Sequence, residues 1–181
     1  MEILKNGRKL VDKMNKIKIL DACCGGKMFW FNKNEPHTTY LDNRKGTFTF
    51  MDRGRTRSIN VEPTVVGDFR KMPFDDKTFD LVVFDPPHLK RAGQLSWLRA
   101  KYGVLPKDWK SYIYTGMTEC LRVLKPTGVL IFKWSDNQIP FNEVLKVLPK
   151  SPILGDKRGH TRWYVILHNQ PDDLLLELPF S

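Results

Sequence analysis

The chain has 181 residues, 30 of them basic and 20 acidic, so its formal net charge is +10 and favours a polyanionic partner such as nucleic acid. The length fits a single domain over residues 1–181 with one hydrophobic core. No run of about 18 apolar residues predicts a membrane-spanning helix, and the charged start is unlike a secretion signal, so we expect a cytoplasmic protein without a membrane partner.

The first half of the chain alternates predicted strands with short connections. We predict a helix over 2–15, a strand over 17–21, a short helix over 28–32 and a second strand over 37–42. Residues 46–61 alternate apolar and polar side chains around a central Asp-Arg-Gly, which predicts a β-hairpin. This hairpin insertion stands where a helix would usually connect two parallel strands.

The second half begins with the continuous β-branched and aromatic run Leu81–Phe84, typical of a strand buried on both faces of a parallel sheet. Helices are predicted over 90–100, 109–124 and 142–148, a strand over 128–134, and a terminal antiparallel pair over 153–157 and 162–167. This order predicts an α/β fold with a mostly parallel central sheet, a terminal antiparallel strand and flanking helices.

The run Asp85-Pro86-Pro87-His88 follows the buried strand directly. Parallel sheets bind ligands at the carboxyl ends of their strands, so Asp85 lies where a substrate would bind. The two prolines end the strand and hold the turn rigid. A fixed carboxylate beside a flat ring suits an exocyclic amino group on a planar base. The plainer interpretation is a strand terminator followed by an ordinary surface histidine at His88.

A turn of small residues, Asp21-Ala22-Cys23-Cys24-Gly25-Gly26, follows the first strand. The glycines allow a ligand to approach the backbone, and a helix after the turn would offer free N–H groups, which favours a nucleotide-like cofactor. Neither a P-loop nor an NAD fingerprint is present. Cys23 and Cys24 read as small turn residues rather than nucleophiles. With Cys120 they form neither a disulfide framework nor a zinc pattern, so we expect reduced thiols and no metal site.

The turn resembles the first motif of class I S-adenosylmethionine (SAM) dependent methyltransferases, in the variant D-x-C-C-G-x-G. Family members usually end the second strand with an acid that holds the ribose hydroxyls. Asp42 has this place, 21 residues after Asp21, against about 20 in the analogous dinucleotide fold. The segment 65–69 resembles the third strand of the family. The resemblance implies that Asp68 accepts from the adenine amino group and that Phe69 packs on the ring.

The run 85–88 resembles the [DNS]-P-P-[YFW] motif of methyltransferases that act on amino groups of bases, with His88 in place of the aromatic residue. Segments 72–80 and 121–133 are similar to the loop before the fourth strand and to the helix, turn and fifth strand of the family. Short segments around 96–103 and 129–134 resemble small methyltransferase-like proteins of bacteriophages and prophages. The resemblance implies a Rossmann-like class I methyltransferase fold and SAM as cofactor.

The implied function is methyl transfer from SAM to an exocyclic amino nitrogen of a nucleic-acid base, most plausibly adenine N6 in DNA. Asp85 would accept a hydrogen bond from the amino group, the Pro86 carbonyl would accept the second N–H, and His88 would stack on the base. Trp97 or Tyr102 would help to enclose the base. The predicted phosphate contacts are Arg53, Arg55, Arg57, Lys90 and Arg91.

Several alternatives remain open from the sequence. The substrate could be an RNA base, at guanine N2 or adenine N6, or a small molecule or protein side chain. The chain could also be an inactive, nucleic-acid-binding relative. The arginines at 53, 55 and 57 would equally suit a solvated hairpin face. Target selectivity would come from the hairpin, from the segment 89–110 as a substrate-recognition segment, or from a protein partner.

Overall fold

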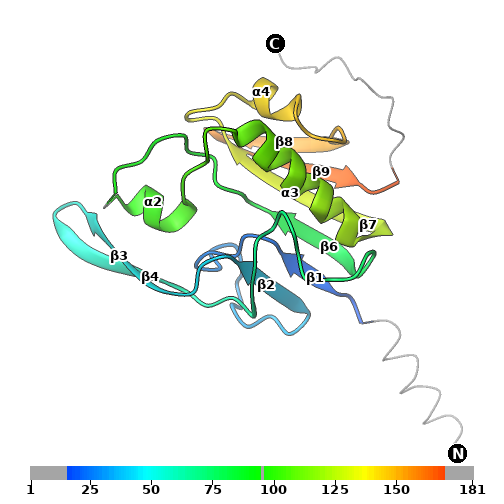
Figure 1. The fold of residues 1–181 in the computed structure, drawn as a ribbon, viewed down its shortest axis with the longest axis horizontal. Coiled ribbons are helices and arrows are strands. Elements are labelled where there is room, and N and C mark those ends of the chain that lie inside the picture. The colour runs from blue at the N-terminus through cyan, green and yellow to red at the C-terminus, as the bar shows by residue number, and fades with distance from the viewer. Residues whose placement is uncertain (1–15, 95, 170–181) are drawn as a thin grey trace, which may run out of the picture.

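The computed structural model describes residues 16–94 and 96–169, and the predicted helix over 2–15 lies outside them. Within the described residues, seven strands form one sheet in the order β5-β2-β1-β6-β7-β9-β8 (Figure 1). Their bounds are β1 Ile19–Asp21, β2 Thr38–Asp42, β5 Val65–Val66, β6 Phe79–Phe84, β7 Leu124–Ser135, β8 Leu154–Arg158 and β9 Thr161–Leu167. Strand β9 runs antiparallel to β7 and β8, and the other neighbouring strands of this sheet are parallel, which confirms the predicted sheet and its terminal antiparallel pair.

The hydrophobic core lies between one face of this sheet and two helices, α3 (Trp109–Val123) and α4 (Phe141–Leu145). Leu130, Phe132 and Trp134 alternate along β7 and are fully buried, because successive strand residues point to opposite faces. Figure 1 shows α3 crossing this face of the sheet. The predicted helix over 109–124 is confirmed, whereas the helix predicted over 142–148 is shorter than expected.

The helix predicted over 28–32 is wrong, because residues 22–37 form turns and bends. Lys27 adopts a left-handed conformation with φ 55°. The two aromatic side chains that follow it, Phe29 and Trp30, contact different parts of the protein. Phe29 packs edge-on against Trp163 with ring centroids 5.0 Å apart, and Trp30 donates to Asp21 at 2.7 Å. These tertiary contacts override the helical pattern. The turn after β1 therefore has no helix N-terminus behind it.

The helix predicted over 90–100 begins late, as α2 (Trp97–Tyr102). The segment before it is pinned to the loop after β7, where Arg91 and Gln138 exchange two hydrogen bonds of 2.9 Å. Ser96 caps the N-terminus of α2, because its hydroxyl accepts from the Arg99 N–H at 3.3 Å. Residues 90–94 of the predicted helix are therefore an irregular connection that follows the Asp-Pro-Pro turn.

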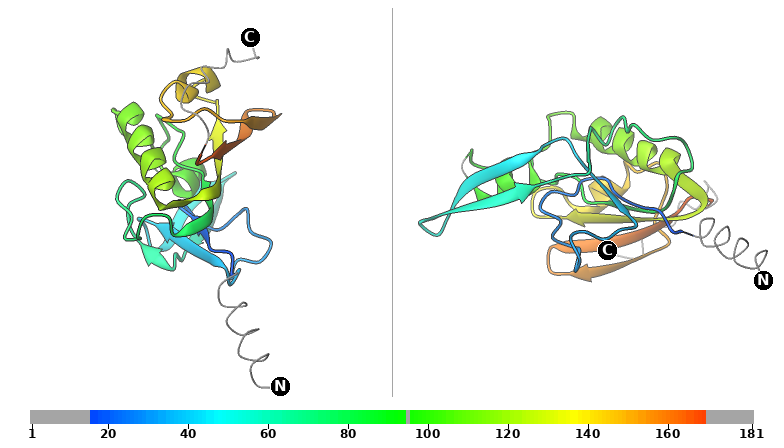
Figure 2. Two further views of the ribbon diagram at one scale, coloured as in Figure 1. Left: turned by 90° about the vertical axis from the view of Figure 1, so that its right-hand side faces the viewer. Right: turned by 90° about the horizontal axis from the view of Figure 1, so that it is seen from below.

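The predicted hairpin is confirmed as a separate two-stranded sheet, β3 (Gly46–Asp52) and β4 (Arg55–Val61). Arg53 and Gly54 both have positive φ, as a tight two-residue hairpin turn requires. The hairpin extends away from the main sheet and lies beside α2 (Figures 1 and 2). A bridge between Met51 and Ser96 joins the two elements. None of the helices among the described residues is long and apolar enough to cross a membrane.

Candidate functional site

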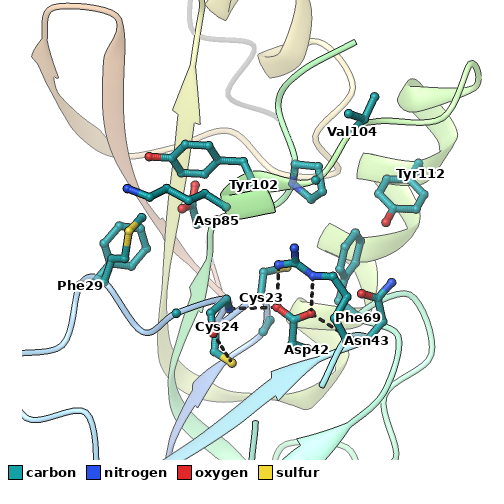
Figure 3. Close-up of a pocket in the computed structure, with 18 residues that line it drawn as sticks. Cys23, Cys24, Phe29, Asp42, Asn43, Phe69, Asp85, Tyr102, Val104 and Tyr112 are labelled. Carbon is teal, nitrogen blue, oxygen red and sulfur yellow. Dashed lines mark hydrogen bonds and ion pairs between the residues drawn. The ribbon is translucent and has the colours of Figure 1, made fainter. Parts of the chain in front are cut away.

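A cavity of about 230 Å³ opens at the carboxyl ends of β1, β2 and β6 (Figure 3). The chain passes from β1 to β2 on one side and later to β6 on the other, so the cavity lies at the point where the strand order reverses. Open α/β sheets bind ligands at this point. The lining residues include the turn 22–26, residues 42–44, Phe69, Asp85, Pro87, the segment 101–104 and Tyr112.

Asp85 lines this cavity, and one of its two carboxylate oxygens has no hydrogen-bond partner. Its side chain is only 8% exposed, and its Oδ2 accepts from the Lys133 ammonium at 3.0 Å. Its Oδ1 is buried and has no hydrogen-bond partner. Burial raises the pKa of Asp85, and the Lys133 cation opposes this rise. A buried acceptor without a partner is costly, so the arrangement suits a ligand that donates a hydrogen bond.

His88 and Pro86 do not line the cavity. Both are buried, whereas Asp85 and Pro87 face the cavity, because an extended proline run sends alternate residues to opposite sides. The His88 ring packs against Tyr102 and Trp134, with centroids 5.0 and 6.2 Å away. Burial, together with the Lys133 cation, lowers the pKa of His88 to about 4, so the imidazole is neutral at pH 7. The aromatic ring next to Asp85 in the cavity is Tyr102 (Figure 3).

Asp21 is a buried support of the turn and does not line the cavity. It is 1% exposed, and its oxygens accept from the Trp30 indole at 2.7 Å and the Cys23 N–H at 3.3 Å. Burial is the largest cause that raises the pKa of Asp21 to about 7, and Asp85 and Asp42 add to it. Asp21 therefore fixes the shape of the turn through these hydrogen bonds, on the side of the turn away from the cavity.

The residues from Ala22 to Gly26 do line the cavity. Gly25 has φ +48°, and its N–H donates to Asp42 Oδ2 at 2.9 Å, which ties the turn to the end of β2. A Cβ on Gly26 would lie 2.7 Å from Ile59 Cδ1, so the hairpin packs directly on the turn. Burial raises the pKa of Cys24 to about 12 and that of Cys23 well above its usual range. Both are therefore protonated thiols and poor nucleophiles.

Asp42 lines the cavity, but Arg44 saturates its carboxylate. Oδ1 accepts from the Arg44 backbone N–H at 2.9 Å and from its Nε at 3.1 Å, while Oδ2 accepts from Gly25 and from the Arg44 guanidinium at 3.4 Å. The same guanidinium donates to the Ala100 carbonyl in α2 at 2.9 Å. Arg44 thus links the end of β2 to α2 across the mouth of the cavity.

Of the two neighbouring residues Phe69 and Asp68, the first lines the cavity and the second does not. Phe69 lines the cavity and packs edge-on against Tyr112, with centroids 4.9 Å apart. Asp68 does not line the cavity, because its carboxylate turns to Arg70, which donates from its backbone N–H at 2.8 Å and from Nε at 3.0 Å. The hydrogen bonds from Arg70 lower the pKa of Asp68.

The basic residues predicted to contact nucleic acid lie outside the cavity. Arg53, Arg55 and Arg57 are exposed on the hairpin, where Arg57 pairs with Asp52 at 3.2 Å. Lys90 and Arg91 are exposed on the connection to α2. Helix α2 carries the exposed Trp97, and the Lys101 ammonium lies 5.0 Å from the centre of its ring. The hairpin, the connection and α2 therefore all carry exposed cations, and α2 adds an exposed aromatic ring.

The sequence analysis missed Arg44 and Lys133. Arg44 had a local signal, because a basic residue two positions after a strand-end acid can fold back onto it, as Arg70 does onto Asp68. Lys133 had a pattern signal: it is a cation inside an apolar strand, on the face opposite Phe132 and Trp134. Both residues contact a predicted site acid.

No protein-family model matches the chain, and comparison with curated proteins finds no match. The fold is similar to those of several solved structures. One is the PH0226 protein from Pyrococcus horikoshii OT3, with a TM-score of 0.53, 19% identity and coverage of 91% of this chain and 88% of that chain. Another is a SAM-dependent methyltransferase from Leishmania major, with a TM-score of 0.50, 12% identity and coverage of 89% and 70%. The predicted Rossmann-like class I methyltransferase fold is confirmed.

Proposed function

We propose that this protein is a SAM-dependent methyltransferase that acts on an exocyclic amino nitrogen of a nucleic-acid base. The free Oδ1 of Asp85 carries this proposal, because a buried carboxylate oxygen at the cavity needs a donor such as an amino group. The fold shared with the Leishmania enzyme makes SAM the first cofactor to test. Adenine N6 in DNA is the first substrate to test, and RNA bases come next.

The cavity residues fit SAM on one condition. The glycines at 25 and 26 leave room for close approach, Asp42 suits a ribose diol, and Phe69 with Tyr112 offers apolar surface to the adenine. However, the present cavity of about 230 Å³ is below the usual range of roughly 300–1,000 Å³ for ligand sites. Arg44 also lines this cavity, and its guanidinium occupies the Asp42 oxygens. The condition is therefore that this guanidinium moves off the carboxylate before a ribose diol binds there.

Bound SAM would supply a methyl group that its sulfonium already activates. The task of the protein is then positioning, because alignment of the two reacting groups lowers the barrier. Asp85 Oδ1 would accept one N–H of the target amino group and orient its lone pair toward the methyl group. Tyr102 would offer a ring face to the base, in the role first assigned to His88. A base in a duplex would have to be extruded to reach Asp85.

The exposed cations on the hairpin and beside α2 support a nucleic-acid substrate. These cations would hold phosphates while the base enters the cavity, and the exposed Trp97 would offer a stacking surface. Such contacts are not specific for sequence. Selectivity would come from the hairpin, the segment 89–110 or a protein partner. A cytoplasmic location agrees with this substrate.

The test begins with isothermal titration of SAM, followed by transfer of a tritiated methyl group to DNA and RNA. Asp85→Ala should bind SAM within about twofold of the wild type and lose transfer. Lys125→Ala, which removes a cation at the far end of the same two strands, should keep both. Mass spectrometry of the digested product would identify the methylated base. Transfer that survives in Asp85→Ala would refute the assigned role.

A non-catalytic nucleic-acid-binding protein is the second candidate, and the saturation of Asp42 by Arg44 favours it. In this case SAM would not bind, because no oxygen of Asp42 is free for the ribose. Nucleic acid would still bind with an affinity that falls steeply with salt. Titrations with SAM and with DNA therefore separate the two candidates.

A further inference from the structure

Lys133 is a largely buried cation to which the proposed function assigns no role. Its side chain is 12% exposed and lies at the carboxyl end of β7, on the sheet face opposite the main core. Its Nζ lies 4.5 Å from the ring centre of Phe29, 5.8 Å from Tyr102 and 5.7 Å from Trp163. These rings come from three separate segments. They favour a cation at this position and replace part of the water that it has lost.

The register of the sheet places Lys133 beside Asp85. Strands β6 and β7 are parallel, and Phe84 is the register partner of Phe132. The next residue on each strand points to the opposite face, which brings Asp85 and Lys133 together at the edge of the cavity. The resulting bond from Nζ to Oδ2 of 3.0 Å uses one carboxylate oxygen and leaves Oδ1 free.

We propose that Lys133 is a positioning residue for Asp85: it holds the carboxylate through Oδ2 so that Oδ1 faces the cavity as a hydrogen-bond acceptor. The inference rests on the proposed methyltransferase function. Lys133 would not touch the target base. It would act through Asp85, whose second oxygen receives the amino group.

The charge of Lys133 has a second consequence for Asp85. Burial raises the pKa of Asp85, and the Lys133 cation and its hydrogen bond are the influences that lower it. The other titratable neighbours give no such help: Asp21 is itself an acid, the pKa of His88 is lowered to about 4, and the pKa of Tyr102 is raised. Without Lys133 the carboxyl group would take up a proton at higher pH. A protonated carboxyl group can donate to an amino nitrogen and occupy its lone pair, which opposes attack.

The central experiment replaces Lys133 by Met and by Gln. Both variants lose the charge, while Gln keeps an N–H donor for Oδ2. Lys125→Met is the matched control, because Lys125 pairs with Asp80 at 2.7 Å at the opposite end of the same two strands. We expect both Lys133 variants to lower kcat by about 10²-fold, with KM for SAM within about twofold. The acidic limb of kcat against pH should move to higher pH in both variants, and Lys133→Arg should restore its position.

A second readout needs no activity. Carbon-13 NMR of the Asp85 carboxyl group follows its titration directly in the full chain. The pKa of Asp85 should rise in Lys133→Gln and Lys133→Met and stay unchanged in Lys125→Met. An unchanged Asp85 titration, or a wild-type kcat and pH profile in the folded variants, would overturn the proposal. If the wild type transfers no methyl group to any substrate, the proposed function fails, and the NMR titration still decides whether Lys133 controls Asp85.

Discussion

Removal of the Arg44 guanidinium should strengthen SAM binding. In the structure this group occupies the Asp42 oxygens that a ribose diol would need, and it also bonds to the Ala100 carbonyl at 2.9 Å. A ligand that uses Asp42 must first break these contacts. In Arg44→Ala the carboxylate keeps two backbone N–H donors, from residue 44 itself and from Gly25, and both of its oxygens gain a free position.

The size of the effect follows from these contacts. Hydrogen bonds that involve a charged group contribute about 1.5–3 kcal/mol when well shielded. The Arg44 side chain is 26% exposed, and its contact with Oδ2 is long at 3.4 Å, so solvent screens part of this energy. We expect that separating the Arg44 guanidinium from Asp42 costs about 1–2 kcal/mol. Because Arg44→Ala avoids this cost, its affinity for SAM should be roughly 5- to 30-fold higher than that of the wild type.

Isothermal titration and thermal unfolding, each with and without SAM, would measure this effect. The free Arg44→Ala protein should unfold at a lower temperature, because it has lost the same contacts, while the stabilisation by SAM should increase. Lys125→Ala is the control for the loss of one positive charge, since its pair with Asp80 is remote from the cavity. Equal or weaker SAM binding by Arg44→Ala would mean that Arg44 belongs to the bound state, and the reasoning would be refuted.

Three further predictions address stability and nucleic-acid binding. Because burial raises the pKa of Asp21 to about 7, the folded protein keeps a proton that the unfolded chain releases near pH 4. The free energy of unfolding from urea titrations should therefore fall as pH rises from about 4 to 7, and this fall should be smaller in Asp21→Asn. Replacement of Arg53, Arg55 and Arg57 by Gln should lower the slope of log affinity for duplex DNA against log salt by up to about 3; an unchanged slope would assign them to a solvated hairpin face. The double variant Asp85→Leu with Lys133→Met should be as stable as the wild type or more so in urea unfolding, yet inactive, whereas Lys133→Met alone should be less stable.

The sequence predicted the sheet well because each strand carries its own pattern. The run Leu81–Phe84 and the alternation over 46–61 are local signals, and both match strands in the structure. The helix over 28–32 failed for the opposite reason. Its aromatic residues make long-range contacts, such as Phe29 with Trp163, that no local pattern contains. Elements that depend on distant partners were therefore the ones predicted least well.

The candidate site shows the same division. Sequence motifs placed Asp85, Asp42 and the glycine turn at the ends of neighbouring strands, and the structure brings them to one cavity. Motifs did not give the direction of each side chain. The donors nearest to each carboxylate decide its orientation: Asp21 points to the Trp30 indole and Asp68 points to Arg70. The alternation that two prolines impose on the chain sends His88 to the side opposite Asp85.

The two lysine–aspartate pairs on β6 and β7 are the clearest argument that one end of this sheet is built for chemistry. The pair of Lys125 with Asp80 has side chains 36% and 34% exposed, where an ion pair costs little and contributes little. The pair of Lys133 with Asp85 is 12% and 8% exposed, and burial of two charges usually costs more than their attraction returns. Apolar residues at these two positions would continue the strands and pack against Phe29 and Trp163. Stability therefore explains poorly a largely buried ion pair whose carboxylate lines a cavity and keeps one oxygen without a partner. Positioning of a substrate donor explains both the cost of the pair and its place at the cavity.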